Sequence, residues 1–547
     1  MVLSYLTYRI QAHTLHSRRQ SHVENAKIDR TIFTASILLV IIVCLPLTLF
    51  PEKGSDVVNA LFTFLTSQLG VLYLWAGIAC LGFLLWLSFS RYGNIVLGFA
   101  DEKPKFSLYS WVSMLFCGGV ATGILYLGTI EWTYYYESPP YGVESRSIEA
   151  AEWASTYGMF HWGLIGWGFY ALPAVAIGYY YYVRKVPYMR LSTSCYGVFS
   201  KPGGGAMGRV IDITFMAGLI GAIGTSIGLG TPMISAGLSR LFGFEESFML
   251  NVVVVIIVTS LFASTVYIGL EKGIKRLADI NMALAILILL FVLLAGGATL
   301  FIVRMGTNSI GMMFQNFVRM STWTDPIADT GFVGNWTVFY WAWWIAVGPF
   351  MGIFLAEISR GRTIRQIILG SLFFGSFGCA VYYIILGNYA LHLELNDHVS
   401  VTGILAEEGA PAAIISVVAA LPFGNVLLSL FCVVSVIFMA TTYNSSSYAL
   451  ASCASSKMKP GQQPARWHRL FWALAMIALP LTLMFTGDLK AGGFKSQAFN
   501  SLKTASLAVS LPLLLVFVIM AFSLAKSLKE HDNSVGRQSS PPTGPED

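Results

Sequence analysis

The chain has 547 residues, of which 55% are apolar and only 11% are charged, and its mean hydropathy is +0.66. This composition excludes an ordinary soluble enzyme and a disordered protein, and it indicates an integral membrane protein. The formal net charge is +6, but the basic residues lie in short segments between apolar runs. Nucleic-acid binding is therefore not indicated.

Twelve apolar runs are long enough to cross a bilayer, which takes roughly 20 residues in a helix. In chain order they lie at about 32–50, 68–90, 108–130, 156–183, 208–236, 249–270, 278–304, 335–357, 364–388, 411–452, 468–486 and 502–526. The sequence therefore predicts an all-α integral membrane protein with about 12 transmembrane helices.

The charges between the runs predict the orientation of the spans. With the N-terminal segment inside, the inner connections hold the basic residues Arg91, Lys103, Lys105, Arg184, Lys185, Arg190, Lys272, Lys275, Arg276, Arg360, Arg362, Arg365, Lys457, Lys459, Arg466 and Arg469. The outer connections hold the acids Glu137, Glu144, Glu149, Glu152, Glu394, Asp397, Glu407 and Glu408. This positive-inside pattern predicts a bacterial inner-membrane protein with both termini in the cytoplasm.

Helix breakers interrupt two of the spans. The third span contains Gly118, Gly119 and Gly123, and the eighth contains Gly348-Pro349; glycine weakens a helix and proline removes a helical hydrogen bond. Because these spans lie five apart, two five-helix halves would each begin with a broken helix, which points to a transporter site at the interface of two repeats.

The expected division of the chain follows from this correspondence. It gives an N-terminal tail over 1–30, two peripheral helices over 31–104, a first repeat over 105–305, an external connector helix over 306–334, a second repeat over 335–526 and a disordered tail over 527–547. No close-spaced cysteine pair occurs among the seven cysteines, so neither a disulfide framework nor a metal cluster is indicated.

Tryptophans gather just before the second pair of helix breakers, in Trp341-Ala342-Trp343-Trp344. A single tryptophan in a span more often packs against lipid or lies at the interface. Three within four positions favour an aromatic wall, and tryptophan faces attract quaternary ammonium cations where water is excluded.

Polar groups within the spans offer a site for a hard cation. In the tenth span Thr441 and Thr442 follow Phe438 by one turn, and two hydroxyls with a carbonyl oxygen suit sodium. The alternative is that these hydroxyls bond to their own helix or to a neighbouring one. The acids Glu131, Asp212, Asp279 and Glu357 lie close enough to span ends to snorkel or pair, which we favour over a proton or ion site.

Three segments together resemble the betaine/carnitine/choline transporter family over about residues 30–525, and most closely its carnitine/betaine branch. They are 160–170 (FHWGLIGWGFY), 336–344 (WTVFYWAWW) and 358–363 (ISRGRT). The resemblance implies a leucine-transporter-type inverted repeat of five plus five helices, in a protein that assembles as a homotrimer.

The resemblance also implies a site. Its aromatic box comprises Trp162, Trp167, Tyr170 and Trp344, with Trp341 and Trp343 along the path and Gly119 and Gly123 at the broken third span. Its sodium ligands are backbone at Cys117, Val120 and Phe438 and the hydroxyls of Thr441 and Thr442. Asn281 stands where sodium-independent exchangers carry an arginine, Val347 stands where an aromatic residue is usual, and Glu357 replaces a usual arginine.

We therefore expect a secondary transporter that takes up a zwitterionic quaternary ammonium compound, such as glycine betaine or carnitine, by sodium-coupled alternating access. Sodium-independent exchange of carnitine for a related betaine is the alternative within transport. A channel or membrane enzyme is the alternative of another class, but the sequence shows no catalytic constellation and no continuous polar pore. Betaine, carnitine, choline and sulfonium analogues are not distinguished.

Overall fold

A computed structural model describes residues 26–49, 51–120, 122–201, 205–268, 273–459, 462–489 and 497–539. Within them the chain is almost entirely helical and forms no strand, only two isolated bridges, Ile28 to Ser455 and Val96 to Thr363. The tail expected over 1–30 lies mostly outside the described residues.

The first half of the described chain has sixteen helical elements. They are α2 (Arg30–Leu49), α3 (Pro51–Thr63), η1 (Phe64–Gln68), α4 (Gly70–Phe89), η2 (Arg91–Asn94), α5 (Leu108–Gly119), α6 (Gly123–Glu137), α7 (Ile148–His161), α8 (Leu164–Gly178), η3 (Tyr179–Val183), η4 (Leu191–Cys195), α9 (Tyr196–Phe199), α10 (Gly205–Phe242), α11 (Phe248–Ile268), α12 (Lys275–Ala295) and α13 (Thr299–Thr322).

The second half continues with η7 (Val333–Val338), α14 (Phe339–Ile358), α15 (Ile364–Gly370), η8 (Ser371–Gly375), α16 (Ser376–Tyr382), η9 (Tyr383–Gly387), α17 (Asn388–Leu395), α18 (Val401–Glu407), α19 (Ala410–Ala419), α20 (Gly424–Cys453), α21 (Arg466–Leu489) and α22 (Gln497–Ser539). Among the described residues, nine helical stretches and one bent pair are long and apolar enough to span a membrane. The runs expected at 32–50 and 468–486 correspond to α2 and α21.

The two interruptions expected from helix breakers have different outcomes. In the third span, α5 ends at Gly119 and α6 begins at Gly123, and the two helices meet at 61°. The expected break at Gly348-Pro349 is wrong, because α14 runs through both residues as one helix. A Cβ atom at Gly348 would lie 2.6 Å from the carbonyl oxygen of Phe169, so this glycine lets α14 approach α8 closely.

Two further boundaries differ from the sequence expectation. The connector helix expected over 306–334 is α13, which begins already at Thr299. The tail expected to be disordered from 527 is helical as far as Ser539, because α22 continues. Contacts hold this extension: the Tyr179 hydroxyl donates to the Ser527 carbonyl oxygen at 3.1 Å, and Arg91 pairs with Asp532. Residues 540–547 lie outside the described part.

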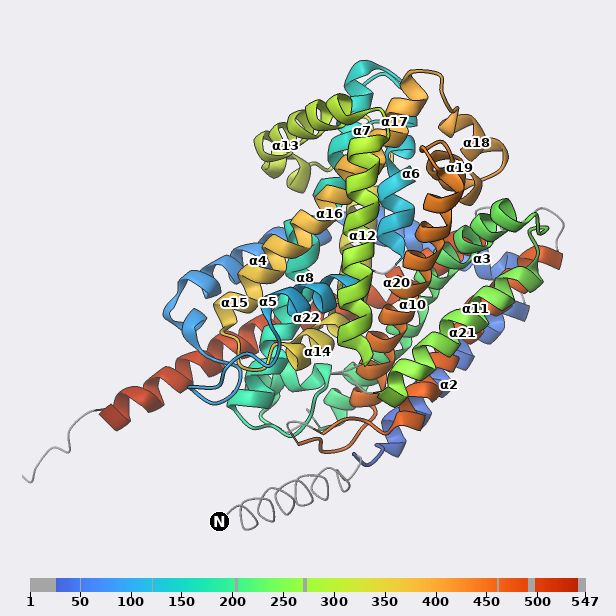
Figure 1. Ribbon diagram of the computed structural model, residues 1–547. Helices are drawn as coiled ribbons and strands as arrows, with labels where there is room; N and C mark the ends of the chain where they lie inside the picture. Colours follow the sequence, from blue (N-terminus) through green and yellow to red (C-terminus); the bar gives the residue numbers. More distant parts are fainter. Residues whose placement is uncertain are drawn as a thin grey trace, which may run out of the picture.

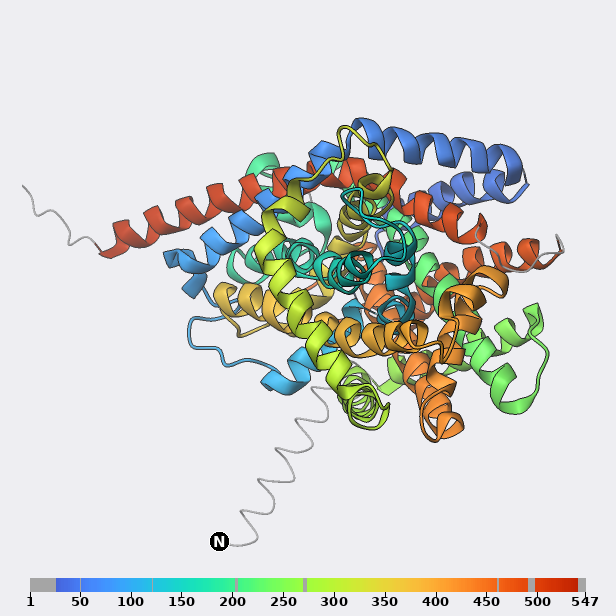
Figure 2. The same ribbon diagram turned by 90° about the horizontal axis from the view of Figure 1, so that it is seen from above.

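The centre of the molecule is a bundle in which α14 packs along α8, with α5, α10, α20 and α22 around the pair. Nearly all of α14 is buried. Helix α13 lies across one end of the bundle, beside α7 and α17 (Figure 1), and the view onto that end shows α13 crossing over the helices below (Figure 2).

The two ends of the bundle carry opposite charges, and we name them accordingly. The acidic end holds the loop from α6 to α7 and the helices α17 and α18, with Glu137, Glu144, Glu149, Glu394, Asp397 and Glu407. The basic end holds the loops after α4, η3 and α14, with Arg91, Lys103, Lys105, Arg184, Lys185, Arg360 and Arg362.

Candidate functional site

Four aromatic rings from two packed helices meet in the centre of the bundle. Trp162 caps the end of α7, Trp167 and Tyr170 lie on α8, and Trp344 lies on α14. The Trp344 ring centroid is 4.8 Å from Tyr170 and 5.3 Å from Trp162, and Trp167 lies 5.4 Å from Tyr170. The indole N–H of Trp344 donates to the carbonyl oxygen of His161 at 3.0 Å, which fixes this ring. The structure thus brings the four expected box residues together.

The other two tryptophans of α14 differ in their position. Trp343 joins the box, since its ring centroid lies 5.1 Å from Trp344 and 5.7 Å from Trp162. Trp341 packs instead against Phe160 and Phe169, with centroids 5.5 and 6.4 Å away. Trp341 therefore supports the neighbouring helices and does not contact the four box rings.

Both glycines of the bent third span face the box. The Tyr170 hydroxyl donates to the Gly119 carbonyl oxygen at 2.9 Å, and a Cβ atom at Gly119 would lie 3.1 Å from the Tyr170 ring. A Cβ atom at Gly123 would lie 3.7 Å from Trp162. The two helix ends that meet at this bend, at Gly119 and Gly123, are therefore directly beside the rings.

The box is closed in this conformation. Trp162, Trp167 and Trp344 are 0% exposed and Tyr170 is 1% exposed, and the rings contact one another. A cation held over an aromatic face lies within about 6 Å of the ring centroid. Neighbouring centroids lie closer than that to each other and all four rings are buried, so the box is shielded from solvent in this conformation.

Oxygen atoms converge where α20 crosses the end of α5. The Thr441 hydroxyl lies 3.1 Å from the Cys117 carbonyl oxygen and 2.8 Å from that of Phe438, and the Thr442 hydroxyl lies 3.3 Å from the Cys117 oxygen. Oxygens that share a hard cation at about 2.4 Å lie at such separations. Val120 caps α5 one turn later and is buried, but it contacts neither threonine hydroxyl among the contacts described.

The side chain beside these oxygens is neutral. The amide nitrogen of Asn281 lies 3.9 Å from the Cys117 sulfur, which places this neutral side chain beside the oxygens. In the described part of the chain no group of three His, Cys, Asp or Glu residues could hold a metal. The donor set therefore fits sodium and does not fit a transition metal.

A buried acid lies next to the box, at a position that the sequence analysis misjudged. Glu131 lies in the middle of α6, not at a span end, and it is 0% exposed. Its carboxylate accepts hydrogen bonds from the hydroxyls of Tyr135, Tyr340 (2.7 Å) and Tyr383. The imidazole of His161 lies 4.0 Å away. The spacing of Glu131 and Tyr135, four residues apart on one helix, was the available signal.

A second buried acid, Glu357, lies at the basic end of α14. Its carboxylate is 3.6 Å from the Lys105 ammonium and accepts a hydrogen bond from the Tyr182 hydroxyl at 3.1 Å. The acid that replaces the family's usual arginine is therefore paired with a lysine from the segment that leads into α5.

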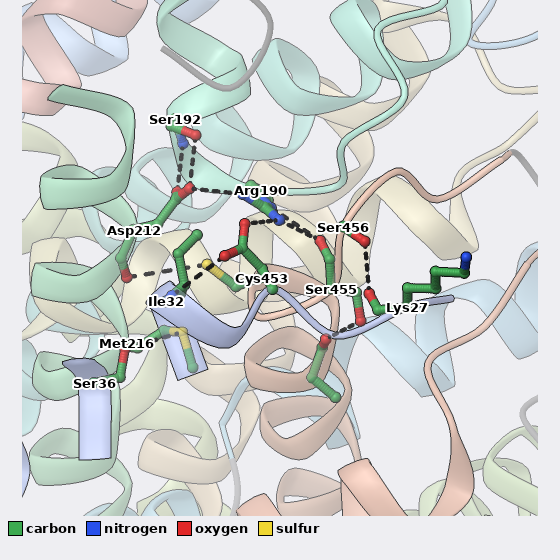
Figure 3. Close-up of polar contacts among 12 residues, drawn as sticks. Lys27, Ile32, Ser36, Arg190, Ser192, Asp212, Met216, Cys453, Ser455 and Ser456 are labelled. Carbon is green, nitrogen blue, oxygen red and sulfur yellow. Dashed lines mark hydrogen bonds and ion pairs between the residues drawn. The ribbon is translucent and has the colours of Figure 1, made fainter. Parts of the chain in front are cut away.

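A third buried acid belongs to an ion network that also contains the N-terminal segment (Figure 3). Arg190 donates to Asp29 at 3.0 Å and to the Ser455 carbonyl oxygen at 2.5 Å, and it lies 3.9 Å from Asp212. Asp212 also accepts from the backbone N–H and the hydroxyl of Ser192, at 2.9 and 2.8 Å. The network joins the segment before α2 to α10 and to the end of α20.

Comparison with known proteins gives consistent matches over most of the chain. It is 32% identical over 450 residues to the uncharacterized transporter YeaV of Escherichia coli (strain K12), a match that covers 82% of this chain and 91% of that protein. It is 31% identical over 507 residues to a carnitine transporter of Acinetobacter baumannii (strain ATCC 19606), covering 92% and 90%. A solved Na⁺-coupled sialic acid symporter aligns over 82% of this chain and 87% of its own, with 14% identity and a TM-score of 0.37.

The family model described as "BCCT, betaine/carnitine/choline family transporter" matches residues 31–533. This range contains the bent third span, the aromatic box and the oxygen cluster on α20. The chain belongs to the betaine/carnitine/choline transporter family, and it is therefore a transporter and not an enzyme.

Proposed function

We propose that this protein is a secondary active transporter that takes up a zwitterionic quaternary ammonium compound, such as glycine betaine or carnitine, by alternating access. The observation that carries the proposal is the closed box of Trp162, Trp167, Tyr170 and Trp344. Aromatic faces in a water-free site attract methylated ammonium groups. The similarity to a protein named as a carnitine transporter agrees with this substrate class.

Replacing Trp344 with Leu tests the box. The change keeps apolar bulk but removes the ring, and a desolvated cation–π contact contributes about 2 kcal/mol, so affinity for the ammonium compound should fall more than tenfold. Trp75→Leu is the matched control, because this residue is 61% exposed on α4 and far from the box in the chain. Binding of glycine betaine and carnitine to purified protein, measured by tryptophan fluorescence, gives the affinities. Equal affinities for Trp344→Leu and the unchanged protein would contradict the proposal.

The methylated cation should dominate recognition, since no lysine or arginine is among the box residues. Dimethylglycine, a tertiary amine with the same carboxylate, should therefore bind more weakly than glycine betaine. The same fluorescence titration compares them, and equal affinity would contradict an ammonium-centred site.

We also propose that sodium is the coupling ion, bound by the Cys117 and Phe438 carbonyl oxygens and the Thr441 and Thr442 hydroxyls. Replacing both threonines with Val keeps their shape and deletes two ligands, so uptake into proteoliposomes should lose its dependence on external sodium. Potassium makes up the ionic balance throughout. Full uptake without sodium by the unchanged protein would instead support sodium-independent exchange, although Asn281 supplies no positive charge in place of the ion.

The acidic end faces the outside in this proposal, and both termini lie in the cytoplasm of a bacterial inner membrane. The basic loops at the other end support this orientation through the positive-inside rule. We further propose a homotrimer, which native mass spectrometry of the detergent-purified protein tests directly.

A further inference from the structure

Two buried glutamates occupy matching positions at opposite ends of the bundle. Glu131 lies on the third span and accepts from Tyr383, which begins the π-helical segment η9 of the ninth span. Glu357 lies on the eighth span and accepts from Tyr182, in the π-helical segment η3 of the fourth span. Glu131 thus joins the first span of the first half to the second span of the second half. Glu357 joins the first span of the second half to the second span of the first half.

The two glutamates are well separated, and each contacts a different end of α14. Tyr340, a partner of Glu131, is the second residue of α14, whereas Glu357 is the last but one. With a rise of 1.5 Å per residue, these positions lie about 25 Å apart along the helix. The aromatic box, through Trp344, lies between them and closer to Glu131.

The two glutamates differ in whether a cation lies beside the carboxylate. Glu357 has the Lys105 ammonium at 3.6 Å. Among the described residues, Glu131 interacts with three tyrosine hydroxyls, the His161 imidazole and the Trp162 indole. An arginine occurs only beyond this shell: Arg319 lies over the ring of Tyr141, 4.0 Å from its centroid.

A buried carboxylate without a cation is costly, since desolvation of a charge is repaid only by pairing and full hydrogen bonding. Hydroxyl donors offset part of this desolvation cost. We propose that Glu131 is a proton-binding site that is loaded when the acidic end closes. Glu131 takes up one proton from the outer aqueous phase, and the new O–H bond forms on its carboxylate oxygen.

The surroundings of Glu131 suit a proton better than a metal ion. The ligand shell holds one carboxylate, and its hydroxyls already donate to that carboxylate at hydrogen-bonding distance. Space is also short, because a Cβ atom at Gly158 would lie 2.3 Å from the Tyr383 ring. A sodium ion needs several oxygens at about 2.4 Å around an open centre, whereas a proton needs one acceptor.

A chain of exchangeable protons leads from the carboxylate to η7. The His161 Nδ1 atom lies 2.9 Å from the Tyr135 hydroxyl, which contacts Glu131, and its Nε2 atom lies 3.1 Å from the Thr337 hydroxyl. Neutral imidazole donates through one nitrogen and accepts through the other, so the chain can pass a proton in either direction.

The titratable groups around Glu131 come from every element packed against it. They are Tyr134 and Tyr135 on α6, His161 on α7, Tyr340 on α14 and Tyr383 on η9. Helices α10, α16, α17 and α19 also pack on α6, and in the described part of the chain none of their titratable side chains bonds to Glu131. Among these groups Glu131 is the one carboxylic acid, and it is the group to which the proposal assigns the proton.

The link to transport rests on the proposed alternating access. Opening the acidic end separates α6 from α14 and η9 and exposes Glu131 to water. In water the carboxylate is stable in its ionised form. Closing the end buries it again. Proton uptake therefore accompanies closure, and low external pH favours the closed form in which the aromatic box surrounds its substrate.

Thermal unfolding of the purified protein without substrate or sodium tests the site independently of transport. The folded protein should hold one proton that the unfolded chain releases above about pH 5, so the unfolding temperature should fall as pH rises from 5.5 to 8.5. Glu131→Gln should remove this slope, because the amide is neutral and isosteric. Glu149→Gln should keep it, since Glu149 is an exposed acid at the same end.

Uptake into proteoliposomes over the same external pH range, at fixed sodium, tests the link to closure. Uptake by the unchanged protein should rise as external pH falls, by up to tenfold per pH unit for a single proton, and Glu131→Gln should show a flat profile. Glycine betaine stays ionised throughout, because its carboxyl titrates below about pH 4.

The outcomes separate the two proposals. A flat unfolding profile for the unchanged protein, or a Glu131→Gln variant that keeps the normal slope, overturns the proton site. Loss of sodium dependence in Glu131→Gln with an unchanged pH profile also overturns it, by assigning a metal ion to Glu131. If Glu131→Gln does not fold, Tyr383→Phe replaces it. The loss of one hydrogen-bond donor should raise by about one unit the pH at which the unfolding temperature falls. If the protein binds no ammonium compound, the proposed function is wrong, but the unfolding test of the proton site still applies.

Discussion

The two ends of the bundle hold their buried acids in different ways. At the basic end Asp212 lies beside Arg190 and Glu357 lies beside Lys105, so each carboxylate has a cation that the chain itself supplies. At the acidic end Glu131 has hydroxyl donors and an imidazole. A fixed cation offsets the charge of the ionised carboxylate, whereas neutral donors leave that carboxylate without a counter-charge. Removing the cations at the basic end tests this difference.

Replacing Arg190 with Met should have the largest effect on stability. Asp212 would keep its bonds to Ser192 but lose its buried counter-charge, and breaking such a pair costs about 3 kcal/mol. The unfolding temperature of the purified protein should fall clearly, and adding Asp212→Asn should restore part of it. Arg209→Met is the control, since this arginine is exposed on the same helix as Asp212 and should change stability by less than about 0.5 kcal/mol. Equal effects of the two arginines would contradict the role of the network.

Replacing Lys105 with Met should have a smaller effect and should make the two ends alike. The lysine side chain is 26% exposed, so its loss should lower stability by about 2 kcal/mol at neutral pH. Glu357 would then lack a cation as Glu131 does, and the variant should become less stable as pH rises from 5.5 to 8.5, with a steeper slope than the unchanged protein. Lys103→Met, an exposed neighbour, should keep the normal slope. Thermal unfolding across this pH range gives both slopes.

The two tyrosines allow the finest comparison, because each donates one hydroxyl to one of the matched glutamates. Tyr383→Phe should cost about 2 kcal/mol, since the Glu131 carboxylate has no cation to take over from the lost donor. Tyr182→Phe should cost only about 1 kcal/mol, because Lys105 remains beside Glu357. Unfolding temperatures measured side by side decide the order, and a larger effect at Tyr182 would contradict it.

The fold was largely predictable, because the apolar runs of membrane length are helical in the described part of the chain, although several of them form more than one helix. Helix breakers were less informative. Glycines at 118, 119 and 123 do end one helix and begin another, whereas Pro349 sits inside continuous α14. A proline removes one donor but keeps the helix where neighbouring helices pack tightly, as α8 does here against Gly348.

The grouping of the four box residues was expected from the family motif, whereas the burial of Glu131 was not. The four box residues lie within the motif segments, and the structure brings them together. The oxygen cluster lies outside these segments, and its threonines were expected from their spacing to Phe438. Glu131 looked like an acid that could reach an interface, because its position was judged from the end of an apolar run. Only tertiary packing shows that Tyr340 and Tyr383, both distant in sequence, enclose it.

Three glycines lie directly behind the rings of Trp344, Trp167 and Tyr383. A Cβ atom at Gly166 would lie 2.7 Å from Trp344, one at Gly375 2.1 Å from Trp167, and one at Gly158 2.3 Å from Tyr383. A single added methyl group at any of them would push one ring toward the centre of the site or away from its partner. Substitutions behind the rings can therefore change the size of the aromatic box while its four aromatic residues stay the same.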